Sequence, residues 1–296
     1  MRAILLSLLL LGTWAGQAPG LDWSRYGSDP GTLSPPLAFH RLAVTTTDST
    51  KVAAWFVPAQ DSADTAGSGR YPGVVVLPRE GETLSDRLPL IAALSRRGFA
   101  VLAFDHRGQG ASEPFRTDPR ALVYPEYRID ASSALDVLWR RPEVDTVRVG
   151  VIGESRGAVL ALALAGRRPE VRAVVAVGAP RDWKTYLESL EKMTPDQEYF
   201  VPGGWERRDD PDRVIRRFNG AILFVTGNMD TETPTWMARE LYEKYPRPKE
   251  LWIVEDAGHA GDRTPERRLG EAYYDRIAAF LRRELDKKPH RGWPYR

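Results

Sequence analysis

A serine between a strand-like run and a helix-like run constrains the fold of this chain more than any other feature. Residues 147–152 are mostly β-branched and apolar, which favours a strand, whereas residues 158–165 are almost all Ala and Leu, which favours a helix. The pentapeptide Gly-Glu-Ser-Arg-Gly (residues 153–157) lies between them. A strand that turns directly into a helix brings the two backbones close together, so the residues two before and two after Ser155 must be small, and both are glycine.

This context is the one that a G-x-S-x-G nucleophile elbow requires. The serine adopts a strained backbone there and exposes its hydroxyl. The N–H group of Arg156 opens the helix, so it carries the positive end of the helix dipole and can face a developing oxyanion. The pentapeptide alone occurs by chance in roughly one chain in ten of this length. The flanking runs and the residues downstream therefore decide its meaning.

Strand-like and helix-like runs alternate along most of the chain, which predicts an α/β fold. Repeated strand–helix units form a mostly parallel sheet with helices on both faces, and the ligand site lies beyond the carboxyl ends of the strands. A hairpin is predicted first, over residues 40–47 and 51–58. The further strands are predicted over 73–78, 99–104, 147–152, 171–177, 221–226 and 251–254, and the helices over 83–97, 127–140, 156–168, 235–245 and 264–288.

The amino terminus predicts export. Residues 1–18 combine a basic start, a short run of Leu and Ile, and small residues at its end, as a secretory signal peptide does. We therefore expect a secreted or periplasmic protein with no stable membrane anchor after cleavage; a buried helix or a residual anchor is the alternative. Residues 19–39 are predicted to be an extended lead-in, 40–288 one domain and 289–296 a tail.

Composition excludes several classes of site. The chain has no cysteine, which excludes disulfides, thiolate nucleophiles and cysteine metal sites. Its four histidines lack the close spacing of a zinc hydrolase, and its formal net charge of +2 gives no indication of nucleic-acid binding. No metal and no cofactor are predicted, and the sequence does not indicate an oligomeric state.

A serine hydroxyl needs a base, and His259 is the best candidate among the four histidines. His40 precedes the core sheet and His290 lies in the tail. His106 follows a core strand but comes before the serine. His259 follows the last strand in a polar loop flanked by glycines, and this loop is short enough to reach Ser155.

The base works best when a carboxylate orients it, and Asp230 is the preferred acid. It follows the strand predicted over 221–226 and precedes a helix. Asp182 follows the preceding strand and is the alternative, whereas Asp256 is only three residues from His259 and is poorly placed to support the imidazole. Asp230 is also well suited to cap the helix that follows it.

These segments together resemble the α/β-hydrolases, nearest to the dienelactone-hydrolase-like and prolyl-oligopeptidase-like serine hydrolases. The resemblance covers about residues 40–285 and rests on their joint order and spacing. Its motifs are the pentapeptide 153–157, Gly227-Asn228-Met229-Asp230 with Pro234, Gly258-His259, and the 105–112 loop, which is similar to Asp-x-Arg-Gly-x-Gly-x-Ser. It implies an α/β-hydrolase fold with a small lid insertion at about 180–219.

The resemblance also implies an oxyanion hole and a substrate pocket. A backbone N–H after the first buried strand joins that of Arg156 in such enzymes. Pro78 has no N–H, so Arg79 or Glu80 supplies this donor. In the lid insertion, Trp183, Tyr186 and Trp205 are candidates to line an acyl or alcohol pocket, or else to pack the insertion onto the body. In the 105–112 loop, Asp105 and Arg107 are expected to pair with each other.

The predicted function is that of a serine hydrolase that cleaves a small-molecule ester through an acyl-enzyme. The absence of cysteine argues against the activity of dienelactone hydrolases proper, whose nucleophile is a cysteine. The absence of a propeller domain weakens a peptidase assignment. Two alternatives remain: a serine peptidase or amidase with the same three residues, and a catalytically silent binding protein with this fold.

Overall fold

The computed structural model describes residues 21–60 and 69–288. One sheet of eight strands forms its centre, in the order β1-β2-β4-β3-β5-β6-β7-β8. β2 pairs antiparallel with β1 and β4, and all the other pairs are parallel. The strands are β1 (His40–Thr45), β2 (Lys51–Val57), β3 (Tyr71–Leu77), β4 (Ala100–Phe104), β5 (Val144–Glu154), β6 (Val171–Val177), β7 (Ala221–Gly227) and β8 (Lys249–Val254).

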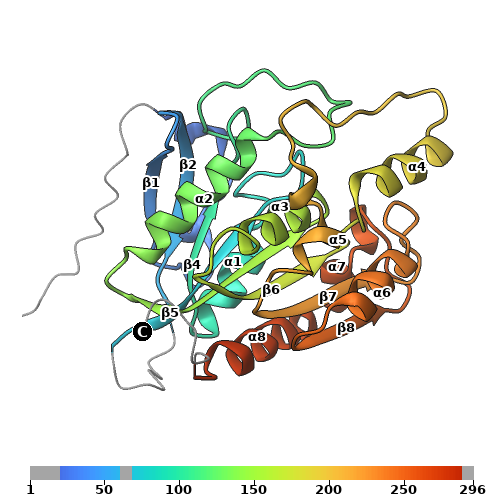
Figure 1. Cartoon of the computed structure of the whole chain (residues 1–296). Helices are drawn as coiled ribbons and strands as arrows, with labels where there is room; N and C mark the ends of the chain where they lie inside the picture. Colours follow the sequence, from blue (N-terminus) through green and yellow to red (C-terminus); the bar gives the residue numbers. More distant parts are fainter. Residues whose placement is uncertain (1–20, 61–68, 289–296) are drawn as a thin grey trace, which may run out of the picture.

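Helices cover both faces of the sheet, so the predicted mostly parallel α/β architecture is confirmed (Figure 1). α2 and α3 pack on one face, and α1 and α8 pack on the other. The helices are α1 (Leu88–Arg96), α2 (Glu126–Trp139), α3 (Arg156–Ala165), α4 (Trp183–Met193), α5 (Pro211–Val214), α6 (Thr235–Lys244), α7 (Pro265–Leu269) and α8 (Glu271–Leu285).

The strands between the two edges of the sheet are mostly apolar because both of their faces are buried, whereas the edge strands β1 and β8 are only partly buried. Successive side chains of a strand point to opposite faces. In β3, Val75 and Leu77 join the core beneath α2 and α3, whereas Val74 and Val76 join the core beneath α1 and α8. Two buried faces thus explain why the sequence shows continuous apolar runs rather than an alternating pattern.

The prediction of a single terminal helix over residues 264–288 is wrong. The chain instead forms α7 and α8, with Gly270 between them at φ 53°. Glycine adopts this left-handed conformation without the steric penalty that a Cβ atom brings. The N–H of Gly270 still donates to the carbonyl of Glu266, which closes the last turn of α7 before the chain changes direction.

The segment before β1 is attached to the body rather than merely extended. Residues 23–25 and 30–32 form short 3₁₀ turns, and the side chains of Trp23 and Leu37 are buried. The hydroxyl of Tyr26 donates a hydrogen bond to the buried carboxylate of Asp105. The predicted signal peptide over 1–18 and the tail over 289–296 lie outside the described residues.

The expected pair of Asp105 and Arg107 does not form. Arg107 instead contacts Asp130 and Asp48, each at 2.7 Å. Asp105 accepts from the backbone N–H of Leu84 at 2.8 Å as well as from Tyr26. The two side chains point to different elements, so this loop is held by partners that the motif itself does not contain.

We expect Tyr26→Phe to lower the free energy of unfolding by about 1–3 kcal/mol, because it removes the side-chain hydrogen bond to the buried Asp105 carboxyl. Chemical denaturation measures the change. The control is Tyr71→Phe, since Tyr71 has no carboxylate partner for its hydroxyl within residues 21–60 and 69–288. An equal and small loss in both variants would contradict this role for Tyr26.

No helix within the described ranges has the length and apolar character needed to cross a membrane.

Candidate active site

Ser155 lies at the tip of a sharp turn between β5 and α3. Its backbone has φ 55° and ψ −120°, a conformation that non-glycine residues rarely adopt. A Cβ atom on Gly153 would lie 2.0 Å from the carbonyl oxygen of Gly157, and one on Gly157 would lie 2.5 Å from that of Pro78. Both flanking positions therefore exclude any side chain, as the sequence predicts.

Ser155, His259 and Asp230 form one chain of hydrogen bonds. The serine Oγ lies 2.8 Å from Nε2 of His259, and Nδ1 of the same ring lies 2.8 Å from Oδ2 of Asp230. The three residues come from the ends of three different strands, β5, β8 and β7. With the ring proton on Nδ1, the imidazole donates to Asp230 and accepts from the serine hydroxyl.

Asp230 is fixed in place by the loop that carries it. Its carboxylate accepts from the N–H of Thr233 at 2.7 Å and from the hydroxyl of Thr233 at 2.8 Å. It therefore caps the loop and holds His259 at the same time. The side chain of Asp230 is buried, and the imidazole of His259 is the group that can carry a positive charge next to it.

The alternative residues lie elsewhere. Asp182 accepts from the N–H of Thr185 at 2.9 Å at the start of α4 and pairs with Arg181, so it caps a helix. Asp256 is exposed and lies near Arg268. The ring of His106 stacks on Tyr127 in the interior, with no hydrogen-bond partner for either ring nitrogen among the described residues.

A cavity of about 480 Å³ opens over Ser155. Tyr186, one of the three predicted pocket residues, lines it, but Trp183 and Trp205 do not. These two indoles pack edge to face at 5.7 Å, and Trp205 donates to Asp210, so they connect parts of the segment 180–219 with one another. Trp183 also belongs to the core beneath α2 and α3 and Trp205 packs against that core, which attaches the segment to the body. The lining residues are Arg79, Glu80, Gly81, Glu82, Pro119, Ser155, Arg156, Tyr186, Tyr199, Glu232, His259 and Ala260.

Tyr199 and Glu232 also line this cavity, and neither is among the site residues predicted from the sequence. Glu232 follows Asp230 by two positions in the same loop, which is a signal that could have identified it. Tyr199 belongs to the segment 180–219, as Tyr186 does, and that segment therefore borders the cavity. Its action as a lid stays a prediction.

Three backbone N–H groups near Ser155 are available as donors. Arg156 is the first residue of α3, so its N–H has no acceptor inside the helix. The N–H groups of Arg79 and Glu80 donate to no acceptor in the part of the chain that the structure describes. All three residues line the cavity, and the contact of Gly157 with Pro78 keeps the two backbones close together.

Comparison with known proteins agrees with this architecture. Residues 72–216 match the family model described as "Hydrolase_4: Serine aminopeptidase, S33". The esterase Pf2001 of Pyrococcus furiosus superposes with a TM-score of 0.69 at 22% identity, over 88% of this chain and 95% of that chain. The chain therefore has the α/β-hydrolase fold.

Other similar proteins extend the likeness to nearly the whole chain. The uncharacterized protein Rv2307c of Mycobacterium tuberculosis is 27% identical over 94% of this chain and 92% of its own length. Acetyl xylan esterase 1 of Thermoanaerobacterium has a TM-score of 0.61 at 21% identity, over 90% and 88% of the two chains. The family model and the structural neighbours together support a hydrolase of the esterase or peptidase type.

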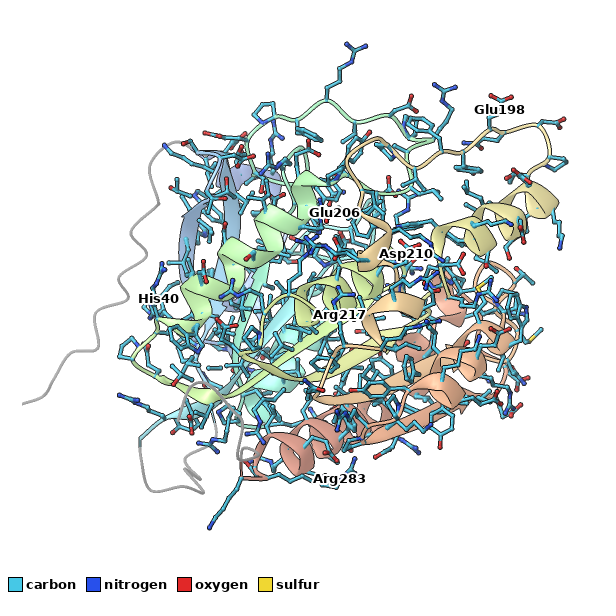
Figure 2. The ribbon with its side chains drawn as sticks, viewed as in Figure 1. His40, Glu198, Glu206, Asp210, Arg217 and Arg283 are labelled. Carbon is cyan, nitrogen blue, oxygen red and sulfur yellow. The ribbon has the colours of Figure 1, made fainter. Side chains whose placement is uncertain are left out.

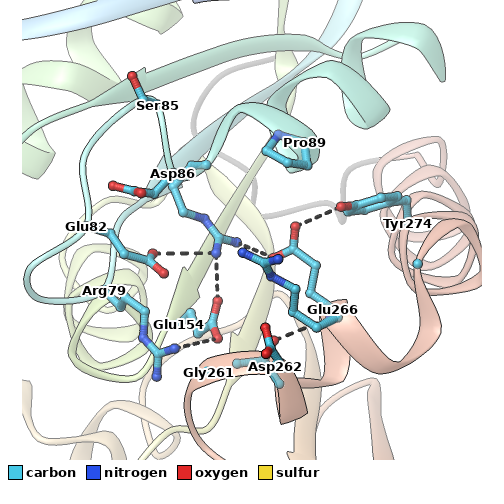
Figure 3. Close-up of a pocket in the computed structure, with 14 residues that line it drawn as sticks. Arg79, Glu82, Ser85, Asp86, Pro89, Glu154, Gly261, Asp262, Glu266 and Tyr274 are labelled. Carbon is cyan, nitrogen blue, oxygen red and sulfur yellow. Dashed lines mark hydrogen bonds and ion pairs between the residues drawn. The ribbon is translucent and has the colours of Figure 1, made fainter. Parts of the chain in front are cut away.

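A network of buried ion pairs lies beside Ser155, in a second cavity of about 560 Å³ (Figure 3). Glu154, the residue before Ser155, accepts from Arg87 at 2.9 Å and lies 3.5 Å from Arg79. Arg87 also lies 3.1 Å from Glu266. The network therefore connects the turn at Ser155 to the loop after β3 and to α7.

Arg79 links this network to the histidine loop. Its Nη2 donates to the carbonyl oxygen of His259 at 2.7 Å. The guanidinium thus holds the backbone of His259 while it pairs with Glu154. In the ranges that the structure describes, no cluster of three or more His, Asp or Glu side chains is arranged to hold a metal ion.

The environment of His259 favours its charged form. Burial disfavours an imidazolium, but the hydrogen bond to Asp230 and the charges of Asp230 and Glu232 outweigh burial, so the pKa of His259 lies above its usual value. The carboxylates therefore stabilise a proton on the ring once it arrives there.

Proposed function

We propose that this protein, which has the α/β-hydrolase fold, is a serine esterase that cleaves carboxylic esters of small molecules through an acyl-enzyme. The observation that carries the proposal is the hydrogen-bond chain of Ser155, His259 and Asp230 beneath an open cavity. This arrangement has the geometry that a serine hydroxyl needs to become a nucleophile: a base within hydrogen-bond distance, oriented by a carboxylate.

In the proposed acylation step, Oγ of Ser155 attacks the ester carbonyl carbon while Nε2 of His259 takes its proton. Asp230 holds the imidazole in the correct tautomer and stabilises the imidazolium. The carbonyl oxygen becomes an oxyanion, which accepts from the N–H of Arg156 and from that of Arg79 or Glu80. Each such donor contributes about 3 kcal/mol to stabilisation of the transition state.

The tetrahedral intermediate then collapses and expels the alcohol. His259 donates its proton to the leaving oxygen, so the alcohol departs neutral and the acyl group stays on Ser155. Water enters, His259 takes one of its protons, and the hydroxide oxygen attacks the acyl carbon. The proton returns to Oγ of Ser155 as the acid leaves, which restores the starting state.

We further propose that the protein is exported. Support comes from residues 1–18, whose basic start, short apolar run and small residues have the pattern of a signal peptide. Amino-terminal sequencing of the protein recovered from its producing cells tests the proposal. A mature chain that begins within a few residues of position 19 is expected, whereas an intact Met1 in a cytoplasmic fraction would contradict export.

A serine peptidase or amidase is the second candidate, because the matching family model is described as a serine aminopeptidase. Initial rates with p-nitrophenyl esters and with aminoacyl p-nitroanilides separate the two. We expect kcat/KM to be far higher for the esters and to disappear in Ser155→Ala. Faster cleavage of the anilides would establish the peptidase, and no turnover of either set by folded protein would favour a silent binding protein.

We expect kcat/KM to rise with pH through the pKa of His259, since only the neutral imidazole can accept the serine proton. That pKa lies above the usual value of about 6.5, so the acidic limb should be centred above pH 6.5 and activity should be greatest at alkaline pH. Two esters of different reactivity should give the same midpoint for the acidic limb of the pH profile of kcat/KM. A limb centred below pH 6.5 would contradict the stabilised imidazolium.

A further inference from the structure

Glu232 lies next to the nitrogen of His259 that faces the serine. Its Oε2 is 3.6 Å from Nε2 of His259, and the same oxygen accepts from the hydroxyl of Tyr186 at 3.3 Å. The side chain is 28% exposed and lines the cavity over Ser155. Its carboxylate is therefore held at the mouth of the site, where it can meet a group of the substrate.

The other charges of this cavity are matched by partners. Arg156 pairs with Glu80 and also donates to the carbonyl oxygen of Ala121 at 3.1 Å. Arg79 pairs with Glu154.

Glu82 lies 3.5 Å from Arg87, so it too has a cationic partner. Glu232 has no Lys or Arg within ion-pair distance in the described ranges. This carboxylate over Ser155 thus forms no direct ion pair with a Lys or Arg side chain, although the guanidinium of Arg156 is close enough to interact with it electrostatically.

Aromatic rings border the same space. Tyr186 and Tyr199 both line the cavity, and Tyr186 is hydrogen-bonded to Glu232. A carboxylate in a cavity that aromatic rings also line is a combination that attracts an organic cation, since the carboxylate carries a full negative charge and a ring can add cation–π attraction. The cavity therefore favours a positive group close to the scissile bond and disfavours a negative one.

We propose that Glu232 is a specificity-determining residue that makes this site prefer esters with a positively charged group near the scissile bond. The inference rests on the proposed esterase function and names its substrate class. The carboxylate of Glu232 pairs with the positive group of the substrate, and the hydroxyl of Tyr186 orients this carboxylate. The carboxylate also lies close to His259 and stabilises its charged form. Removal of the carboxylate therefore changes kcat/KM in two ways: through His259, equally for all substrates, and through the charge of the substrate, only for charged ones.

Two isosteric esters isolate the charge-dependent part. Acetylcholine carries a quaternary nitrogen where 3,3-dimethylbutyl acetate carries a carbon atom, so the two differ in charge and hardly in shape. The ratio of their kcat/KM values cancels any effect of Glu232 on His259. We expect the wild type to prefer the cationic ester and Glu232→Gln to lower the ratio by about tenfold, the effect of one partly screened charge a few ångströms away.

The control variants distinguish the effect of the charge at Glu232 from the effect of a change in the net charge of the protein. Glu198→Gln makes the same chemical change at an exposed side chain in the loop after α4, outside the cavity lining, and should leave the ratio unchanged (Figure 2). Glu232→Asp keeps the charge and should retain most of the preference. Raised ionic strength should weaken the preference of the wild type, because salt screens the attraction.

The outcomes distinguish this inference from the proposed function. If the wild type hydrolyses both esters and the ratio is equal in wild type and Glu232→Gln, Glu232 does not select charge and the inference is overturned. A wild-type preference for the neutral ester overturns it as well. If folded wild type hydrolyses neither these esters nor the p-nitrophenyl esters, the esterase function itself fails. Circular dichroism and a thermal melt establish that each variant is folded. If the glutamine variant is not folded, the dependence of the wild-type ratio on ionic strength carries the test, and a ratio that does not change with salt overturns the inference.

Discussion

Replacement of Asp230 by asparagine is expected to lower kcat by about 10⁴-fold. The carboxylate accepts from Nδ1 of His259 at 2.8 Å, so it selects the tautomer in which Nε2 is free to take the serine proton. An amide at this position can present its NH₂ group to Nδ1 and so favour the opposite tautomer. It also removes the negative charge that stabilises the imidazolium. The loss should appear in kcat for every ester, with a much smaller change in KM.

The matched control for this substitution is Asp182→Asn. Asp182 caps α4 through the N–H of Thr185 and makes no contact with His259 within the described residues. Asparagine caps a helix about as well as aspartate, so this substitution should lower the stability by less than about 1 kcal/mol and leave most of the activity. Steady-state kinetics of both variants with one p-nitrophenyl ester show which of the two aspartates supports the histidine. Loss of activity in Asp182→Asn with activity retained in Asp230→Asn would mean that the acid is assigned to the wrong residue.

The largest expected effect on stability comes from Gly153→Ala. The added Cβ would lie 2.0 Å from the carbonyl oxygen of Gly157 and 2.7 Å from the backbone N of Ala158. These atoms belong to the start of α3, so they cannot move without separating this helix from β5. We expect the free energy of unfolding to fall by about 4 kcal/mol or more, or the protein to fail to fold.

Gly203→Ala provides the comparison for this substitution. No atom lies within 4 Å of a Cβ at Gly203, and its backbone is outside the left-handed region. Denaturant unfolding should show a change of less than about 0.5 kcal/mol there. Equal and small losses in both variants would show that β5 and α3 do not approach as closely at the turn as the structure has them.

The sequence predicted the part of the site that depends on local geometry. The requirement for small residues around Ser155 follows from one strand passing directly into one helix, so neighbouring residues reveal it. The ends of the strands could also be located, because buried strands are continuous apolar runs with polar residues directly after them. Asp230 and His259 were found in this way, each in the loop that follows its strand.

Other features depend on contacts between distant segments, which a local pattern does not contain. Arg107 contacts Asp48 and Asp130 rather than Asp105, its neighbour in the motif. Trp183 and Trp205 pack against each other rather than on the cavity. The break at Gly270 was missed because the residues on either side of it continue a helical pattern, and glycine can lie inside a helix as well as end one.

The most direct test of the nucleophile is covalent labelling of the folded protein with a fluorophosphonate, followed by peptide mass spectrometry. The oxygen of an activated serine attacks the phosphorus atom and displaces fluoride, so the adduct identifies the serine without knowledge of the natural ester. We predict one adduct, on the peptide that contains Ser155, absent in Ser155→Ala and strongly slowed in Asp230→Asn. No adduct on folded wild-type protein, or an adduct that persists in Ser155→Ala, would contradict the assignment of Ser155 as the nucleophile.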